Sequence, residues 1–351
     1  MMMTQPNTGP AAPAAHHVGA ALAAARQALI RGDAPPSRPW RAAGRGQAPP
    51  LQRGWRQHIQ GLAAWLGCAA IAVAPALAAG RPVIVLMTDF GHRADSAAIC
   101  KGVMLGINPE LTVVDLTQDV PHFDIATGAL LLEGTVQYYP KGTAFVAVVD
   151  PGVGTNRRSI AARTQSGHFL VGPDNGLLSL ALEKMGVDEV REITNQSLFN
   201  QLDPLSNTFH GRDVYSPVAA HLASGTAFET VGPVITDWIR LARSVPARAE
   251  GVLRGEATYT DTVFGNIATN IPSEWIAGLG VQPGDYVDVR VGSKRLVMRY
   301  ARTFGEVELG EILLYPSSRS VLDLAIRQGD FAVTFGIQIH DPIEIRKFTA
   351  H

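Results

Sequence analysis

The sequence predicts a three-layer α/β domain with a mainly parallel sheet, followed by a smaller antiparallel β domain. Three observations support this fold class. Short apolar runs alternate with segments of helical spacing from about residue 81 to residue 224. From about Gly251 the pattern changes to short alternating strands, and helices become scarce. The chain has 351 residues with an ordinary globular composition, which is enough for two domains.

The α/β part is expected to begin near Arg81 with a buried parallel strand over 83–87, because this run is short and wholly apolar. The strand ends in the loop Thr88-Asp89-Phe90-Gly91. The elements that follow are expected to be a helix over 95–106, a strand over 111–116, a helix over 124–139, a strand over 143–149, a strand pair over 159–163 and 168–171, and helices over 177–185 and 213–224.

Polar side chains follow three of the predicted parallel strands, at Asp89, Thr117 and Asp150. Ligands of open α/β sheets bind beyond the carboxyl ends of the strands. The sequence therefore predicts a ligand site at this edge of the sheet.

The C-terminal part is expected to contain strands over 255–260, 286–291, 296–300 and 331–335. The segment 242–250, with Pro246 and mixed charge, is the expected linker between the two domains. No internal repeat is visible.

The first quarter of the chain has a different composition. Residues 1–52 are rich in Ala, Pro, Gly and Arg without apolar periodicity, which predicts a disordered leader or, as the alternative, upstream sequence read from a start codon set too early. Residues 53–79 begin with two arginines, continue as an uncharged apolar stretch and end in small residues, as secretory signals do. The alternative is a membrane anchor, but alanine richness and Pro75 favour cleavage near Ala78. We therefore expect an exported or periplasmic protein without a stable anchor, with a cytoplasmic location as the alternative.

Charge and cysteine content limit the possible partners. The formal net charge is −1, so no general attraction to nucleic acid is expected. The two cysteines, Cys68 and Cys100, cannot form a disulfide framework or a cysteine zinc site.

Two polar segments carry the strongest chemical signal. One is Asp150-Pro-Gly-Val-Gly-Thr-Asn-Arg157-Arg158, and the other is Asn207-Thr-Phe-His210-Gly-Arg-Asp213. Taken singly, Asp150 reads as a turn acid, Arg157 as a solvated cation and His210 as a helix-entry histidine. An acid, a cation and an imidazole brought together can instead position and deprotonate a water molecule, with Asp150 and His210 as proton acceptors.

In these segments the chain resembles the S-adenosylmethionine hydrolases (adenosine-forming), also called S-adenosylmethionine hydroxide adenosyltransferases, which are related to chlorinases and fluorinases. The resemblance runs from about residue 82 to 348. The matching motifs, in order, are Thr88-Asp89-Phe90-Gly91, Asp95-Ser96, Asp150 to Arg158, Pro173-Asp174-Asn175-Gly176, Phe209 to Asp213, Asp261-Thr-Val-Phe264-Gly-Asn266 and Ser318-Arg319.

The resemblance implies an α/β domain over 80–245, a β-barrel over 251–348 and a homotrimer with active sites between subunits. It also implies that water attacks the 5′ carbon of S-adenosyl-L-methionine and releases adenosine and L-methionine. The sulfonium is already a good leaving group, so no metal or cofactor is expected, and the protein must orient the water for in-line attack.

The catalytic triad of the hydrolases maps to Asp150, Arg157 and His210. Halogenating relatives lack this triad, since a halide needs no deprotonation. The intact triad therefore favours water as the nucleophile.

By the same resemblance, Asp89 binds the ribose hydroxyls, Phe123 packs on the nucleoside, and Phe264 and Asn266 receive the adenine. Alternatives stay open for several of these residues: Asp89 as a helix N-cap, Phe123 as core, Asp261 as a turn acid, and Arg212–Asp213 as a structural pair. Ala268 stands where fluorinating relatives have tryptophan. The residues matching the methionine-binding groups are Ser96, Asp261, Ser318 and Arg319, the last largely through its backbone.

Three other functions remain as alternatives. One is an adenosyl halogenase. Another is a metal-dependent phosphoesterase using Asp89, Asp150, His210 and Asp213, although no two-histidine metal signature is present. The third is a non-catalytic protein that binds adenosine or S-adenosylmethionine.

Overall fold

The computed structural model describes residues 81–201, 204–249 and 251–349. The predicted leader (1–52) and the predicted signal segment (53–79) lie outside these residues. No helix in the described part of the chain is long and apolar enough to cross a membrane.

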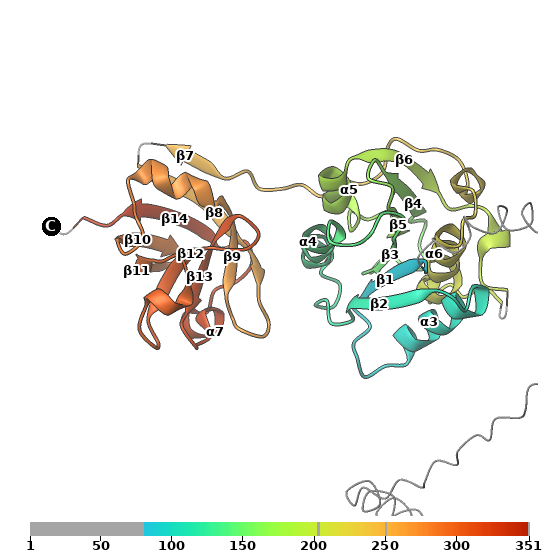
Figure 1. Ribbon diagram of the computed structural model, residues 1–351, viewed down its shortest axis with the longest axis horizontal. Coiled ribbons are helices and arrows are strands. Elements are labelled where there is room, and N and C mark those ends of the chain that lie inside the picture. Colours follow the sequence, from blue (N-terminus) through green and yellow to red (C-terminus); the bar gives the residue numbers. More distant parts are fainter. Residues whose placement is uncertain (1–80, 202–203, 250, 350–351) are drawn as a thin grey trace, which may run out of the picture. The chain divides into compact units, whose positions relative to one another are not determined.

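The first half of the described chain forms a six-stranded sheet with strand order β2-β1-β3-β5-β4-β6 (Figure 1). The pairings β1–β2, β1–β3 and β3–β5 are parallel, while β4 pairs antiparallel with β5 and β6. The mainly parallel sheet and the strand pair over 159–163 and 168–171 are therefore confirmed, and the structure shows that this pair is antiparallel. The strands are β1 (Val83–Thr88), β2 (Thr112–Thr117), β3 (Ala144–Val148), β4 (Ser159–Thr164), β5 (Phe169–Pro173) and β6 (Val187–Glu192).

Helices cover both faces of this sheet, as the predicted three layers require. Side chains alternate across β1, so Ile84 and Leu86 join one buried cluster and Val85 and Met87 join another. The first cluster includes residues of α3 (Ser96–Ile107) and α6 (Ser216–Ala223), and the second includes residues of α4 (Ile125–Val136) and α5 (Ser179–Met185). The uniformly apolar strands of the sequence thus reflect burial on both faces.

The second half forms a closed barrel. The strand order is β14-β10-β11-β12-β13-β9-β8, and β14 pairs again with β8, which closes a ring of seven strands with β7 outside it on β8. All pairings are antiparallel except β11–β12, which is parallel. The strands are β7 (Ala247–Ala249), β8 (Val252–Thr260), β9 (Ile267–Pro272), β10 (Tyr286–Val291), β11 (Lys294–Tyr300), β12 (Ile312–Pro316), β13 (Val321–Ile326) and β14 (Pro342–Lys347).

One predicted strand is wrong. Residues 331–335 form the short helix α7 (Phe331–Phe335), not a strand. Asp330 caps the helix by accepting a hydrogen bond from the backbone N–H of Val333, and Gly336 ends it with a left-handed φ of 64°. A run of five residues, four of them apolar, is too short to separate a buried helical turn from a buried strand, and the two capping residues were the usable signal.

Candidate active site

The acid, the cation and the imidazole of the two polar segments meet in the α/β half. Asp150 lies just beyond β3, Arg157 precedes β4, and His210 precedes α6. One guanidinium nitrogen of Arg157 (Nη2) lies 2.6 Å from Asp150 Oδ2 and 3.1 Å from His210 Nδ1. The Asp150 and Arg157 side chains are only 5% and 8% exposed. The sequence prediction that these three residues converge is therefore correct.

The second guanidinium nitrogen of Arg157 fixes the side chain in place. Nη1 donates to the backbone carbonyl of Arg158 and to the hydroxyl of Ser159. The Tyr215 hydroxyl lies 3.3 Å from Ser159 Oγ and 3.4 Å from Asp150 Oδ2. One carboxylate oxygen of Asp150 is thus held from two sides, by Arg157 and Tyr215.

The other carboxylate oxygen of Asp150 is different. Oδ1 is buried and has no hydrogen-bond partner among the described residues. A buried acceptor without a partner is costly and usually marks a functional group or a bound water. Asp150 also lines a cavity of about 260 Å³. Asp150 Oδ1 is therefore available to accept a hydrogen bond from a ligand or water in this cavity, while Arg157 and Tyr215 hold Oδ2 in place.

The contact with Arg157 determines the tautomer of His210. A guanidinium has donors only, so Nδ1 of His210 must be the acceptor in this contact. In the neutral ring the proton is then assigned to Nε2. Burial and the positive charge of Arg157 both lower the pKa of His210. At neutral pH the imidazole is therefore neutral, and its remaining polar group is a donor.

Burial is also the main cause that raises the pKa of Asp150, and the charge of Arg157 opposes that rise. The low-dielectric surroundings thus increase the basicity of the carboxylate, while Arg157 keeps it oriented.

A π-helical turn places His210 and Tyr215 on the same side. The turn covers Gly211–Tyr215, and the backbone N–H of Ser216 donates to the carbonyl of Gly211, five residues earlier. Such wide turns are frequent at functional sites. A side chain at Gly211 would approach the ring of Phe90 to 3.1 Å, so this position favours glycine.

Asp213, whose role the sequence left open, and Arg158, which ends the first polar segment, both have structural partners. The fully buried Asp213 is bonded by Arg212, by the Asn200 amide and by the backbone N–H of Ser206. These bonds anchor the loop before His210.

Arg158 pairs with Asp174 and Asp237. The neighbouring Asn175 donates to the carbonyl of Val149, the residue before Asp150. The Pro173-Asp174-Asn175-Gly176 motif therefore supports the backbone that carries Asp150.

The cavity beside Asp150 and His210 is also lined by Asp89 and Phe123. Asp89 is not a helix N-cap, because α3 begins after Asp95 and Asp89 Oδ2 accepts from the backbone N–H of Phe123. Phe123 is 69% exposed, so the alternative that it is a core residue is wrong. Its φ of 65° is unusual for an aromatic residue, and such strain is concentrated at functional sites. Ser96 starts α3 and is not among the residues lining this cavity.

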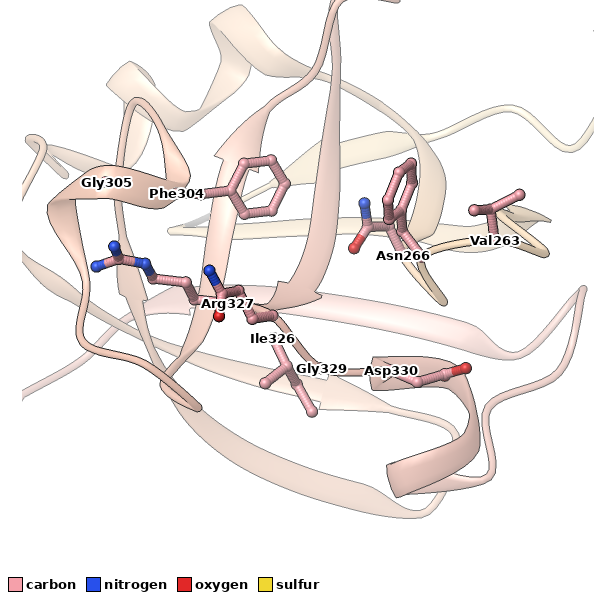
Figure 2. Close-up of a pocket in the computed structure, with 10 residues that line it drawn as sticks. Val263, Asn266, Phe304, Gly305, Ile326, Arg327, Gly329 and Asp330 are labelled. Carbon is pink, nitrogen blue, oxygen red and sulfur yellow. The ribbon is translucent and has the colours of Figure 1, made fainter. Parts of the chain in front are cut away.

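The predicted adenine residues lie on the barrel. Phe264 and Asn266 line a cavity of about 630 Å³ together with Phe304 and Arg327. Figure 2 shows the Phe304 ring and the Asn266 amide pointing toward one another across this cavity. Phe264 is 66% exposed. Aromatic side chains next to the amide groups of Asn266 and Gln328 suit a flat heteroaromatic ring.

A second barrel cavity, of about 530 Å³, shares Asn266 and Phe304 with the first. It is lined by the predicted Asp261, Ser318 and Arg319, and its further lining includes Ala268, Tyr315 and Asp323. Asp261 does act as a turn acid, because its Oδ1 accepts from the backbone N–H groups of Val263 and Phe264.

Sequence reasoning missed three residues of these sites: Tyr215, Phe304 and Asp323. Tyr215 stands five residues after His210, one π-turn away, which no simple periodicity shows. Phe304 precedes a glycine after the end of β11, which is a weak signal for a ligand-facing aromatic residue. Asp323 is an acid inside the apolar run Val321–Ile326, and that was the clearest signal.

Among the residues that the structure describes, no group of three or more His, Cys, Asp or Glu side chains is arranged to hold a metal ion. Two acids of the alternative phosphoesterase site form ion pairs with arginines instead: Asp150 with Arg157, and Asp213 with Arg212.

Comparison with known proteins gives matches along most of the described chain. Residues 84–232 match the family model described as S-adenosylmethionine (SAM) hydroxide adenosyltransferase N-terminal domain, and residues 255–344 match the corresponding C-terminal domain. The chain is 35% identical to an (R)-S-adenosyl-L-methionine hydrolase of Salinispora arenicola over 76% of this chain and 98% of that protein. A fluorinase of an Actinoplanes species is 29% identical over 76% of this chain and 98% of the fluorinase. An uncharacterized conserved protein of Thermotoga maritima has a similar crystal structure, with a TM-score of 0.72 and 38% sequence identity. The match covers 75% of this chain and 100% of that protein.

Proposed function

Since the chain belongs to the SAM hydroxide adenosyltransferase family, we propose that it hydrolyses S-adenosyl-L-methionine to adenosine and L-methionine. The observation that carries this proposal is the buried Asp150–Arg157–His210 network, in which Asp150 Oδ1 has no partner. This network suits a nucleophile that must lose a proton. Water is such a nucleophile.

The mechanism follows from the donors and acceptors of the network. A water molecule donates one hydrogen to Asp150 Oδ1 and accepts a hydrogen bond from His210 Nε2–H. Its oxygen attacks the 5′ carbon in line with the sulfonium, and the electron pair of the breaking C–S bond neutralises the sulfur of the departing methionine. The proton passes to Asp150, and the oxygen with its second hydrogen becomes the 5′-hydroxyl of adenosine.

This assignment changes the role that the sequence suggested for His210. Sequence reasoning treated Asp150 and His210 alike as proton acceptors. With Nδ1 occupied by Arg157, the neutral imidazole has no free acceptor, so we assign His210 to hold the water and Asp150 to take its proton. Arg157 fixes both groups at once.

Halogenation is the second candidate, because fluorinases are among the relatives. The burial of Asp150 speaks against it. A halide needs no base, and the negative charge of a carboxylate in a cavity of low dielectric repels an approaching anion. The same buried acid that activates water therefore disfavours chloride or fluoride.

The remaining residues are proposed to hold the substrate. Asp89 binds the ribose hydroxyls, with Phe123 against the nucleoside, as its exposed ring and strained backbone suggest. Asn266 and Phe264 receive the adenine, with Phe304 opposite the amide. Ser96, Asp261, Ser318 and Arg319 are proposed for the methionyl end.

We propose that the catalytic and the substrate-holding groups are combined in a homotrimer, with each site shared by two subunits. Two exposed aromatic side chains support a shared site, Phe123 on the α/β half and Phe264 on the barrel. Both rings line cavities, so they are positioned to contact a ligand or a partner subunit.

We also propose that residues 53–79 direct export and are removed near Ala78. The measurement is the N-terminal sequence of the protein recovered from its native host. An intact start of the chain on cytoplasmic protein would contradict export.

The proposed reaction is tested by incubating the purified full chain with S-adenosyl-L-methionine and identifying products by mass spectrometry. The two sulfonium epimers are assayed separately, since relatives carry the (R) descriptor in their names. We expect adenosine and L-methionine in equal amounts, also in the presence of a chelator. Asp188→Asn, which removes an exposed acid of the same half, is the matched control. 5′-Chloro-5′-deoxyadenosine as the main product in chloride buffer would overturn the proposal.

A further inference from the structure

Asp323 is a buried acid that the mechanism above does not use. It lies in β13, is 9% exposed, and lines the second barrel cavity. Its Oδ1 is buried without a hydrogen-bond partner among the described residues. A carboxylate oxygen that faces a cavity in this state lacks a donor that a ligand can supply.

The acid that the sequence singled out in this cavity is in a different state. Asp261 uses Oδ1 to accept two backbone N–H groups of its own turn, from Val263 and Phe264. Its first task is therefore to shape the loop that carries Phe264 and Asn266. Asp261 has Oδ2 available to accept a hydrogen bond from a ligand, whereas Asp323 has Oδ1, which accepts no hydrogen bond from the described residues.

The surroundings of Asp323 are those of a cation site whose cation is not part of the protein. Burial raises the pKa of Asp323 to about 7, hydrogen bonding by Ser317, the charge of Arg319 and hydrogen bonding by Tyr315 oppose the rise, and the charge of Asp261 adds to it. Among the described residues no Lys, Arg or His nitrogen lies within 4 Å of this carboxylate. An incoming ammonium group would compensate the buried charge and donate to Oδ1.

The position of the cavity indicates which ammonium group this is. The cavity shares Asn266 and Phe304 with the aromatic cavity, so a ligand with a flat ring in one can reach the other. S-Adenosylmethionine has an adenine at one end and an α-ammonium at the other.

We propose that Asp323 binds the α-ammonium of the methionyl group, with Asp261 Oδ2 as the second acceptor. This inference rests on the proposed function and extends it, because it identifies the residue that selects an amino acid on the sulfonium. The Ser318 hydroxyl, in the same cavity, is then left for the carboxylate end.

The test compares two substrates with the same reacting bond. One is S-adenosyl-L-methionine, and the other is 5′-deoxy-5′-dimethylsulfonioadenosine, which lacks the amino acid. For Asp323→Asn we expect KM for S-adenosyl-L-methionine to rise roughly 10- to 100-fold with kcat nearly unchanged, because a charge-assisted bond is lost. For the truncated sulfonium we expect wild type and variant to have the same kcat/KM.

Two further variants keep the test decisive. Asp288→Asn removes another acid of the same barrel, one already paired with Arg295. We expect it to leave KM and kcat unchanged for both substrates. Asp323→Glu keeps the charge but moves it, so it should raise KM for S-adenosyl-L-methionine alone. If Asp323→Asn does not fold, the KM values of Asp323→Glu for the two substrates test the inference instead.

Each outcome has a distinct meaning. An equal loss with both substrates would assign Asp323 a structural role and overturn the inference. No loss with either would overturn it as well. If the wild type turned over neither substrate, the proposed function would fail, and this inference with it.

Discussion

The α/β site and the barrel cavities differ in how complete they are before substrate arrives. In the α/β half, Asp150, Arg157 and His210 are already joined at 2.6 and 3.1 Å, and the ion pair is almost fully buried. On the barrel, the Phe264 ring is mostly exposed, and Oδ1 of Asp323 has no hydrogen-bond partner among the described residues. Reacting groups gain from being fixed in advance, because no reorganisation is then needed during the reaction. Recognition groups can obtain their partners from the substrate itself.

The largest expected effect is on the prearranged side. Asp150→Asn should lower the single-turnover rate roughly 100- to 10,000-fold, the usual range for general-base catalysis, because the amide cannot take the proton. Calorimetric binding of S-adenosyl-L-methionine should be nearly unchanged, whereas Asp89→Ala should weaken binding instead. If Asp150→Asn impaired binding and left the rate intact, the assignment of catalysis to the α/β half and of recognition to the barrel would be contradicted.

His210 offers a sharper version of the same test. Gln can place a donor near the position of Nε2, whereas Ala cannot. We therefore expect His210→Ala to lose roughly 100-fold or more in turnover and His210→Gln to lose less. Equal losses would argue against a donor role, and near-normal turnover of both His210→Ala and Asp150→Asn would refute the mechanism.

A mixing experiment tests whether the two kinds of site belong to different subunits. Asp150→Ala and Asn266→Ala chains should each have little activity. Unfolding and refolding them together in equal amounts should restore about a quarter of the wild-type activity, because one shared site in four then receives two intact halves. Each variant refolded alone is the control. A fully active monomer at assay concentration would contradict the shared site.

The exposed aromatic wall should affect binding more than stability. Phe304→Ala and Phe264→Ala should raise KM roughly 10-fold each, since an aromatic contact with the base is lost. The melting temperature should change little for Phe264→Ala, because this ring is mostly exposed in the free protein. A large drop in its melting temperature with unchanged KM would place the ring in the core of the assembly instead.

The smallest effect concerns the stability of the barrel. The pKa of Asp323 is raised from 3.8 to about 7 in the folded protein, so the folded state binds the proton more tightly than the unfolded state. The associated stability is present below pH 3.8 and is lost as pH rises toward 7. Asp323→Asn stays neutral, and we expect it to be more stable than wild type by about 1–3 kcal/mol at pH 8 and by less at pH 5. Thermal melts at both pH values check this, and a gain independent of pH would contradict it.

The sequence was most informative where function depends on the ends of parallel strands. Asp89 and Asp150 could be placed together because neighbouring parallel strands end at the same edge. It was least informative on the barrel, where pairing is non-local. β13 lies between β12 and β9, so the site of Asp323 depends on its register with Tyr315 and Ala268, which no local pattern encodes. The proton position on His210 likewise depends on Arg157, 53 residues away in the chain.

The π-helical turn at Gly211–Tyr215 has an evolutionary consequence. Deleting one residue there would convert the turn to an α-turn and rotate the residues immediately before it, including His210, by about 100° relative to α6. His210 would leave Arg157 while Tyr215, the sheet and the barrel stayed in place. One short deletion at this turn could therefore cost a descendant water as its nucleophile while the fold is kept.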